Sequence, residues 1–202
     1  IQTHTVLAKR LNNCRWSRLK LRPAGAYALF GNRLKGTAGK NVPLTDFGVD
    51  WLTDLSESIR LSKNERSIKD ILNERLIRET KSIKDSRSHK LATSYINAIL
   101  AVKGQISVKD LAKNHHISLR HFQRTFTAFF GLSPKKFLNL IRFKHTYKSS
   151  VLQKKDLTNY TGYGYYDQMH FIKDYRKKLG ITPSESSDDT FLQRNKMAKI
   201  SS

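Results

Sequence analysis

A group of polar side chains recurs at helical spacing in a stretch without acidic residues: Arg120, Gln123, Arg124 and Thr127. At 100° per residue they share one side of a helix, and the other side carries Phe122, Phe126, Phe129 and Phe130. Arginine can bond a guanine edge at two points, and glutamine can do the same with adenine, so this face suits a DNA major groove. A polar helix face is more often simply solvated, so the prediction needs independent support.

Support comes from a duplication, because the stretch occurs twice with an offset of 49 residues. The first copy is SLRHFQRTFTAFFGLSP (residues 118–134), and the second is DQMHFIKDYRKKLGITP (residues 167–183). Each copy predicts a helix with a side-chain cap at its start, Ser118 or Asp167, and a left-handed glycine at its end, Gly131 or Gly180. Two copies indicate a duplicated module rather than a solenoid.

The charge of the chain favours a polyanionic partner. Lys and Arg number 38 against 16 Asp and Glu, for a net charge of +22. Residues 91–180, which contain both copies, hold 16 basic and only four acidic side chains. Such a field suits nucleic acid or an acidic membrane surface. No apolar run approaches the roughly 18 residues of a membrane helix, so we expect no membrane partner.

The cysteine count indicates a reducing compartment. Cys14 is the single cysteine, which excludes an internal disulfide. Together with the absence of a signal peptide, this predicts a cytoplasmic protein, which DNA binding would make nucleoid-associated. Cys14 as a redox sensor is a weaker alternative to an inert thiol. Because the sequence begins with Ile1 rather than Met, we expect a fragment or a processed product.

The sequence predicts an α+β protein in which the β structure comes first. Residues 1–50 are expected to be β-rich, because WSRLKLRPAGAYALF (16–30) has short apolar runs around a Pro-x-Gly turn signal. Residues 53–80 are expected to be helical, with a capping box from Ser62 to Glu65. Residues 1–83 would then form a partial regulatory or dimerisation domain. The helical part has an apolar stripe that either packs on the β structure or forms a dimer contact: Ile68, Ile71, Leu72 and Leu76.

Residues 84–186 are expected to form an all-α domain, followed by a polar tail at 187–202. Ser107–Asp110 caps a short helix with Leu111 and Ala112 turned inward, and a tight connection at 115–117 leads to Ser118. Helix, short turn, helix is the helix-turn-helix arrangement. A long, mostly buried helix at 134–152 would join this module to the second one.

These residues resemble the DNA-binding domain of the AraC/XylS family of transcription regulators. The motifs are LAKNHHISLRHFQRTF (111–126), GLSPKKFLNLIRF (131–143) and GYYDQMHFIKDYRKKLGITPSE (164–185). The resemblance implies two helix-turn-helix subdomains joined by a long helix. Their recognition helices would lie on one side of the DNA and enter major-groove segments about 34 Å apart.

The resemblance assigns base contacts to Arg120, Gln123 and Arg124 in the first recognition helix. In the second it assigns Gln168, Met169 and Lys173, a chemically poorer set because Met169 replaces Arg120. The first helix should therefore discriminate bases more strongly. The second should depend on phosphate contacts through Lys173, Arg176 and Lys177, which position a protein without specifying a sequence.

One segment departs from the family pattern. Before Gly164 the family usually has a helix with Ile-Ala, whereas DLTNYTGYG (156–164) is one residue short and lacks that pair. Tyr160 would take the place of the isoleucine. This departure affects the predicted geometry of the second module.

The resemblance also sets the expected partners. It implies double-stranded DNA, RNA polymerase as the target of an activator, a small-molecule effector at the N-terminal domain, and a homodimer. RLKLRPAGAYALFG (18–31) and VPLTDFG (42–48) are similar to the region that precedes the DNA-binding domain in some of these regulators. There a β domain senses a signal or mediates dimerisation.

Other functions fit the sequence less well. We expect no enzyme, because phosphate loops, His-x-x-x-His pairs and cysteine clusters are absent from the sequence. We expect no cofactor and no metal: His115, His116 and His121 are close in sequence but have no nearby cysteine or acidic ligand. The main rival is a non-specific basic protein that binds RNA or DNA. RNA modules usually present aromatic residues on an open sheet, whereas here the phenylalanines lie opposite the polar face.

Overall fold

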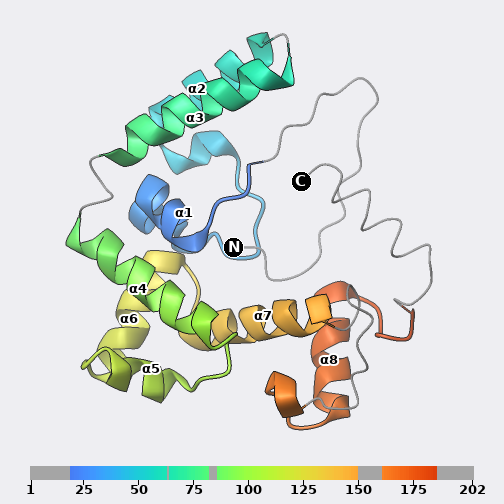
Figure 1. Ribbon diagram of the computed structural model, residues 1–202. Helices are drawn as coiled ribbons and strands as arrows, with labels where there is room; N and C mark the ends of the chain where they lie inside the picture. Colours follow the sequence, from blue (N-terminus) through green and yellow to red (C-terminus); the bar gives the residue numbers. More distant parts are fainter. Residues whose placement is uncertain (1–18, 63, 82–85, 150–160, 186–202) are drawn as a thin grey trace. The chain divides into compact units, whose positions relative to one another are not determined.

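The computed structural model describes residues 19–62, 64–81, 86–149 and 161–185, and the regular secondary structure in these ranges is helical (Figure 1). The elements in order are α1 Pro23–Phe30, η1 Gly31–Leu34, η2 Leu44–Phe47, α2 Asp50–Leu61, α3 Glu65–Lys81, α4 Arg87–Ala101, α5 Val108–Asn114, α6 Leu119–Phe130, α7 Pro134–Tyr147, η4 Thr161–Tyr163 and α8 Gln168–Leu179. No strand occurs within these ranges. The predicted α+β class is therefore wrong, and the architecture is all-helical.

The error lies in the N-terminal part of the chain. Residues 19–50, expected to be β-rich, contain α1 and the two short 3-10 helices η1 and η2. Pro23 does not mark a turn between strands but opens α1, where its missing N–H has no helical partner to lose. The Ala26 amide already donates to the Arg22 carbonyl at 2.8 Å. Residues 1–18, which include Cys14 and Trp16, lie outside the described part of the chain.

The next segment is helical as predicted, but it consists of two helices with a different cap. α2 ends at Leu61, and Ser62 is extended, so Ser62 does not open the following helix. Instead, the Asn64 side-chain oxygen accepts hydrogen bonds from the Ser67 amide at 2.9 Å and the Ser67 hydroxyl at 3.0 Å. α3 packs against α2. The apolar stripe of α3 is half-buried at all four positions: Ile68, Ile71, Leu72 and Leu76.

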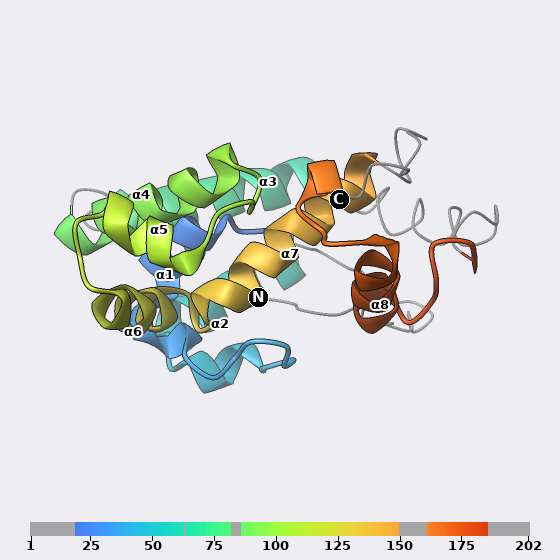
Figure 2. The same ribbon diagram turned by 90° about the horizontal axis from the view of Figure 1, so that it is seen from below.

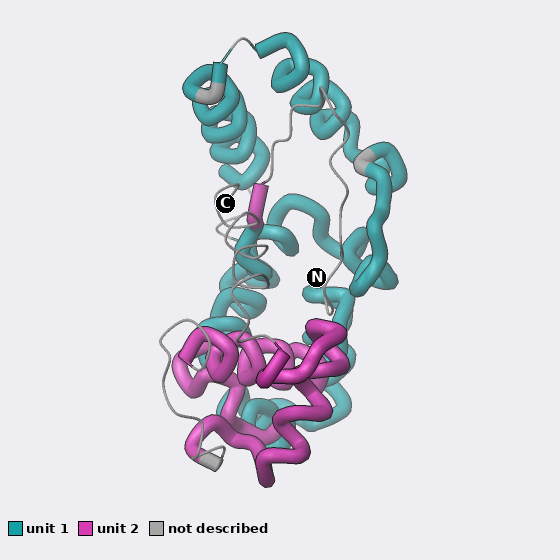
Figure 3. Tube along the Cα trace, turned by 90° about the vertical axis from the view of Figure 1, so that its right-hand side faces the viewer, with its two compact units in different colours: residues 1, 21–98, 108–134 teal, residues 2–20, 99–107, 135–202 magenta. Residues whose placement is uncertain are grey.

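The molecule divides into two compact units. Of the described residues, unit 1 contains those in 21–98 and 108–134, and unit 2 contains those in 19–20, 99–107, 135–149 and 161–185 (Figure 3). In unit 1, α5 and α6 lie next to each other in both ribbon views (Figures 1 and 2). Phe122 and Phe126 of α6 are fully buried, with ring centroids 4.8 and 6.3 Å from Tyr95 of α4. The predicted apolar face of this helix is therefore confirmed.

The N-terminal helices of unit 1 pack directly on the end of α6. Tyr27 of α1 and Phe129 have ring centroids 4.5 Å apart. The carbonyl of Leu34 approaches Gly131 so closely that a β-carbon built on this glycine would lie 2.1 Å from the carbonyl oxygen. The segment predicted as a separate β structure is thus a set of short helices within the same unit as α6.

Unit 2 is built on α7 and α8. Its core contains Phe143 of α7, Tyr165 from the turn before α8, and Phe171 and Tyr175 of α8. The rings of Phe143 and Tyr175 are 5.6 Å apart, and those of Phe171 and Tyr175 are 5.5 Å apart. The apolar side chains of α7 are buried or half-buried, as predicted, whereas its lysines are exposed. Its predicted last residues, 150–152, lie outside the described ranges, as do Tyr160 and the tail at 187–202.

Candidate nucleic-acid interface

The first copy of the repeat forms a helix-turn-helix in unit 1. α5 buries Leu111 and Ala112 as predicted, and the turn that follows depends on His116, whose φ is +54°. The Ser118 hydroxyl oxygen then accepts a hydrogen bond from the His121 amide at 3.2 Å. Gly131 ends α6 in the left-handed region, with φ +65°. Both predicted caps are confirmed, so α6 starts and stops where the sequence indicates.

The predicted reading face of α6 is open to solvent. Arg120, Gln123 and Arg124 are exposed, and Thr127 is half-buried. The Thr127 hydroxyl donates to the Gln123 carbonyl at 2.8 Å, so part of its hydrogen-bonding capacity is used within the helix. An Arg124 guanidinium nitrogen lies 3.3 Å from Nδ1 of His121. The face therefore presents long donor groups with one of them held by a neighbour one turn away.

The second copy has the same frame and a different surface. The Asp167 carboxylate accepts a hydrogen bond from the His170 amide at 2.6 Å, and Gly180 ends α8 with φ +80°. All five predicted contact residues are exposed: Gln168, Met169, Lys173, Arg176 and Lys177. Ile172, which stands where the first copy has Gln123, is half-buried. This helix therefore offers cations along its length and few groups that could bond two points on one base.

A largely buried polar network, which joins α8 to the turn before it, was not predicted from the sequence. Asp174 accepts a hydrogen bond from the Tyr165 hydroxyl at 2.9 Å and forms an ion pair with Lys178 one turn later. The Lys178 ammonium also lies 4.9 Å from the centre of the Phe143 ring. Burial raises the pKa of Tyr165 far above its usual value, and the Asp174 charge raises it further, so the hydroxyl remains a donor. The i,i+4 spacing of Asp174 and Lys178 was the signal in the sequence from which their ion pair could have been predicted.

The segment that departs from the family pattern is described only in part. η4 covers Thr161–Tyr163, and residues 156–160 lie outside the described ranges. Within unit 2, the Gln105 side-chain amide donates to the Gly162 carbonyl at 3.2 Å. Arg142 of α7 donates to the Gly104 carbonyl, also at 3.2 Å. These bonds connect the loop at 103–107 both to η4 and to α7.

His115 gives the first module a pH dependence that can be measured. Its ring packs edge-on against Tyr95 at 4.6 Å, and no described group bonds its Nε2 atom. Burial, with a smaller contribution from the His116 charge, lowers the pKa of His115 below its ordinary value. The unfolded chain therefore binds this proton more readily than the folded one. The contribution of neutral His115 to the free energy of unfolding should be fully present above the ordinary histidine pKa of about 6.5. This contribution should be lost as the pH falls from there towards the lowered pKa.

We expect His115→Phe to flatten the dependence of unfolding free energy on pH between about 5 and 7.5. Urea unfolding at a series of pH values measures this slope. Tyr95→Phe is the control, because burial raises the pKa of Tyr95 and its hydroxyl does not ionise in that range. An unchanged slope in His115→Phe would show that the proton binds His115 equally in both states.

Some functions receive no support from the described residues. Within the described ranges, no three His, Cys, Asp or Glu side chains come together as a group that could hold a metal ion. Among the helices described, none combines the length and apolar character needed to cross a membrane.

Comparison with known proteins bears on residues 111–188, which match a family model described as a helix-turn-helix domain. The matched segment starts in α5 and includes α6, α7 and α8, so it covers both copies of the repeat. No curated protein and no solved structure matches the chain. The match supports an AraC-type helix-turn-helix DNA-binding domain, and hence a DNA-binding transcription regulator.

Proposed function

We propose that this regulator binds a bipartite duplex site, with α6 and α8 each entering one segment of the major groove. The observation that carries the proposal is the repetition of one capped helix, from Ser118 to Gly131 and from Asp167 to Gly180, each with exposed donor groups. A single polar helix face has many explanations. Two corresponding helices with exposed donor groups, on a chain of net charge +22, favour one repetitive polyanion as the partner.

The two helices have different roles in this proposal. Arg120, Gln123 and Arg124 of α6 would bond base edges, since arginine and glutamine suit guanine and adenine; Thr127, whose hydroxyl is engaged, would contribute less. On α8, Gln168 and Met169 lie in the first turn, where recognition helices meet bases. Lys173, Arg176 and Lys177 would neutralise phosphates and fix the register of the protein.

Selection of bound duplexes from a random library, at about physiological salt, tests the proposal directly. We expect an enriched sequence with two blocks about 10 base pairs apart. A single block would remove base readout from α8 and leave it a phosphate-binding role. Strong salt-sensitive binding without enrichment would favour the alternative, a non-specific basic nucleic-acid-binding protein, which the net charge alone would explain.

Arg124→Ala should weaken binding to the selected duplex by about 1–3 kcal/mol and relax the preference at one base pair. Arg124 is exposed, so the variant should fold normally. Titrations against duplexes that differ at single positions of the first block measure the preference. A loss that is equal for every sequence would instead identify Arg124 as a phosphate contact.

Lys177→Ala should weaken binding to all duplexes alike and reduce the slope of log affinity against log salt by about 1. The reason is that one fewer phosphate is neutralised, so one fewer counterion is released. Titrations between 50 and 200 mM salt, on the order of the range in which such slopes are measured, provide the value. Lys69→Ala, on the exposed surface of α3, is the matched control. An unchanged slope in Lys177→Ala would exclude the phosphate contact.

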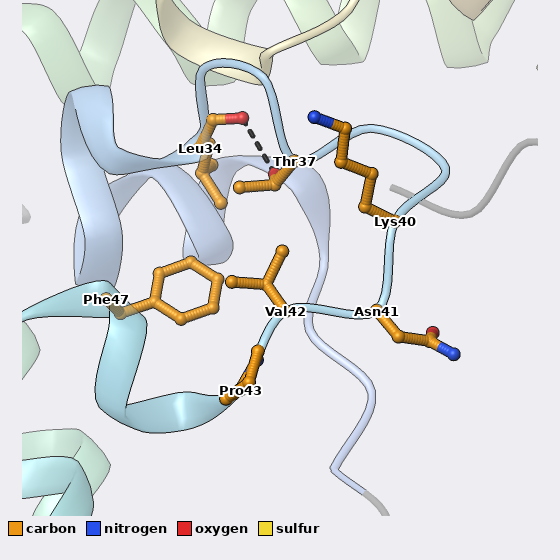
Figure 4. A pocket seen from close by; sticks show the side chains of 7 residues that line it. All are labelled: Leu34, Thr37, Lys40, Asn41, Val42, Pro43 and Phe47. Atoms are coloured by element: carbon orange, nitrogen blue, oxygen red, sulfur yellow. Dashed lines mark hydrogen bonds between the residues drawn. The ribbon is translucent and has the colours of Figure 1, made fainter.

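The N-terminal helices are proposed to regulate this binding, through an effector or a homodimer contact. An open hollow of about 580 Å³ lies beside η1, lined by Leu34, Thr37, Lys40, Asn41, Val42, Pro43 and Phe47 (Figure 4). The Leu34 carbonyl accepts a hydrogen bond from the Thr37 hydroxyl at 2.8 Å. The same carbonyl packs closely against Gly131 at the end of α6. This contact connects the N-terminal helices directly to α6, the first recognition helix of the proposal. Activation through RNA polymerase follows from the resemblance alone, whereas the proposed cytoplasmic, nucleoid-associated location follows from the single cysteine and from the DNA partner.

A further inference from the structure

Two large apolar side chains are exposed at the start of α8. Tyr166, one residue before the N-cap, is 87% exposed, and Met169 in the first turn is 57% exposed. Their equivalents in the first copy are different in kind. Ile117 corresponds to Tyr166 and is half-buried, and the charged Arg120 corresponds to Met169. The second copy therefore presents apolar surface where the first presents a guanidinium.

The local structure holds this apolar surface in place. Tyr165 is 3% exposed, and its hydroxyl donates to Asp174 within α8, which fastens the turn to the helix. Because its neighbour points into the core, Tyr166 points outward. Asp167 then caps the helix through the His170 amide, which sets the first turn that carries Met169. Tyr166 and Met169 are thus presented by one anchored element.

The chemistry of the major groove limits what such a surface could recognise. Guanine, cytosine and adenine present hydrogen-bonding groups there, whereas thymine also presents a C5-methyl group, which protein apolar side chains contact. The N-terminal residues of a recognition helix are those that reach base edges. At this place, Tyr166 and Met169 would gain an apolar contact from a thymine methyl group. Against a base without that methyl group, the base edge would lose water and gain no hydrogen bond from these side chains.

We propose that Tyr166 and Met169 bind thymine methyl groups, so that α8 reads thymine-containing steps while α6 reads guanine and adenine. The Tyr166 ring would cover a methyl group, and its hydroxyl would remain free to reach solvent or a phosphate. The proposal deepens the proposed function and rests on it. It also makes α8 a source of sequence discrimination, in addition to its phosphate contacts.

Replacement of thymine by deoxyuridine in the selected duplex tests this inference, since it removes the methyl group and preserves base pairing. For wild-type protein, each contacted thymine in the second block should bind roughly fourfold less tightly as deoxyuridine, as expected for one lost apolar carbon. Met169→Ala and Tyr166→Ala should each bind the thymine duplex more weakly and should reduce or abolish this ratio. Arg124→Ala, in the first recognition helix, should retain the ratio although its affinity is lower.

Each other outcome has a separate meaning. Sequence-specific binding that is insensitive to deoxyuridine throughout the second block would overturn the inference and leave the proposed function standing. Equal losses by Met169→Ala on both duplexes would also overturn it, because the contact would not involve the methyl group. Absence of any enriched duplex would overturn the proposed function itself. Thermal unfolding of both variants provides the check that these exposed positions do not alter folding.

Discussion

Gly131→Ala should destabilise the protein clearly more than Gly180→Ala, although the two glycines end equivalent helices. Both have positive φ, +65° and +80°, so alanine at either position should cost about 1–2 kcal/mol. The surroundings differ. At Gly131 the new β-carbon would lie 2.1 Å from the Leu34 carbonyl oxygen and 2.9 Å from its carbon, so the backbone of η1 must move. This should add about 1–3 kcal/mol, as overpacking of a core does.

Gly180→Ala is the matched control for this comparison. No described atom lies within 4 Å of the point where its β-carbon would stand. Urea unfolding measures both variants, and the difference between them reports the packing of η1 against the end of α6. Equal losses of unfolding free energy in the two variants would contradict that packing, and with it the direct contact between the N-terminal helices and α6.

Lys178→Met should cost about 3 kcal/mol, because it leaves the Asp174 carboxylate largely buried without its cation. The side chains of Lys178 and Asp174 are only 12% and 17% exposed. The Tyr165 hydroxyl would remain as the one hydrogen bond described for that carboxylate after the change. Methionine has nearly the length of lysine and can still pack on Phe143, so the loss should come from the charge rather than from a cavity.

A triple variant separates this electrostatic explanation from simple loss of packing. Tyr165→Phe, Asp174→Leu and Lys178→Met together remove the hydroxyl, the carboxylate and the ammonium, and replacement of a whole buried polar group by apolar residues is often close to neutral. We expect urea unfolding to place the triple variant near wild type and Lys178→Met well below it. Glu57→Gln, which removes the exposed ion pair with Arg60, should change stability by less than about 1 kcal/mol. A triple variant as unstable as Lys178→Met would contradict the electrostatic explanation.

The boundaries of α6 and α8 were predictable because the sequence signals for them are local. A serine or aspartate hydrogen-bonds an amide three residues later, and a glycine adopts positive φ without a steric cost. Ser118, Gly131, Asp167 and Gly180 all do so at the predicted positions. The buried and exposed faces of α6 follow equally from residue spacing, since one side is phenylalanine and the other polar.

The identity of the N-terminal segment could not be obtained in this way. Short apolar runs around Pro23 fit a strand as well as a helix by periodicity, and the choice depends on distant partners. Tyr27 packs on Phe129, and Leu34 packs on Gly131, about a hundred residues further along the chain. Similarly, Ser62 and Asn64 are both acceptable caps, and the extended conformation of Ser62 at the end of α2 leaves Asn64 in that role.

The chemistry of α8 shows the same division within a single helix. Its ends, its basic composition and its equivalence to α6 are properties of the sequence alone. Which of its polar residues are exposed and which lie against the core depends on packing between elements: Asp174 and Lys178 are drawn inward by Tyr165 and Phe143, and Tyr166 is turned outward by the burial of Tyr165. Short-range hydrogen bonds and residue spacing therefore determined where α6 and α8 begin and end, whereas burial against residues distant in sequence decided the fold of the N-terminal segment and the surface that α8 presents.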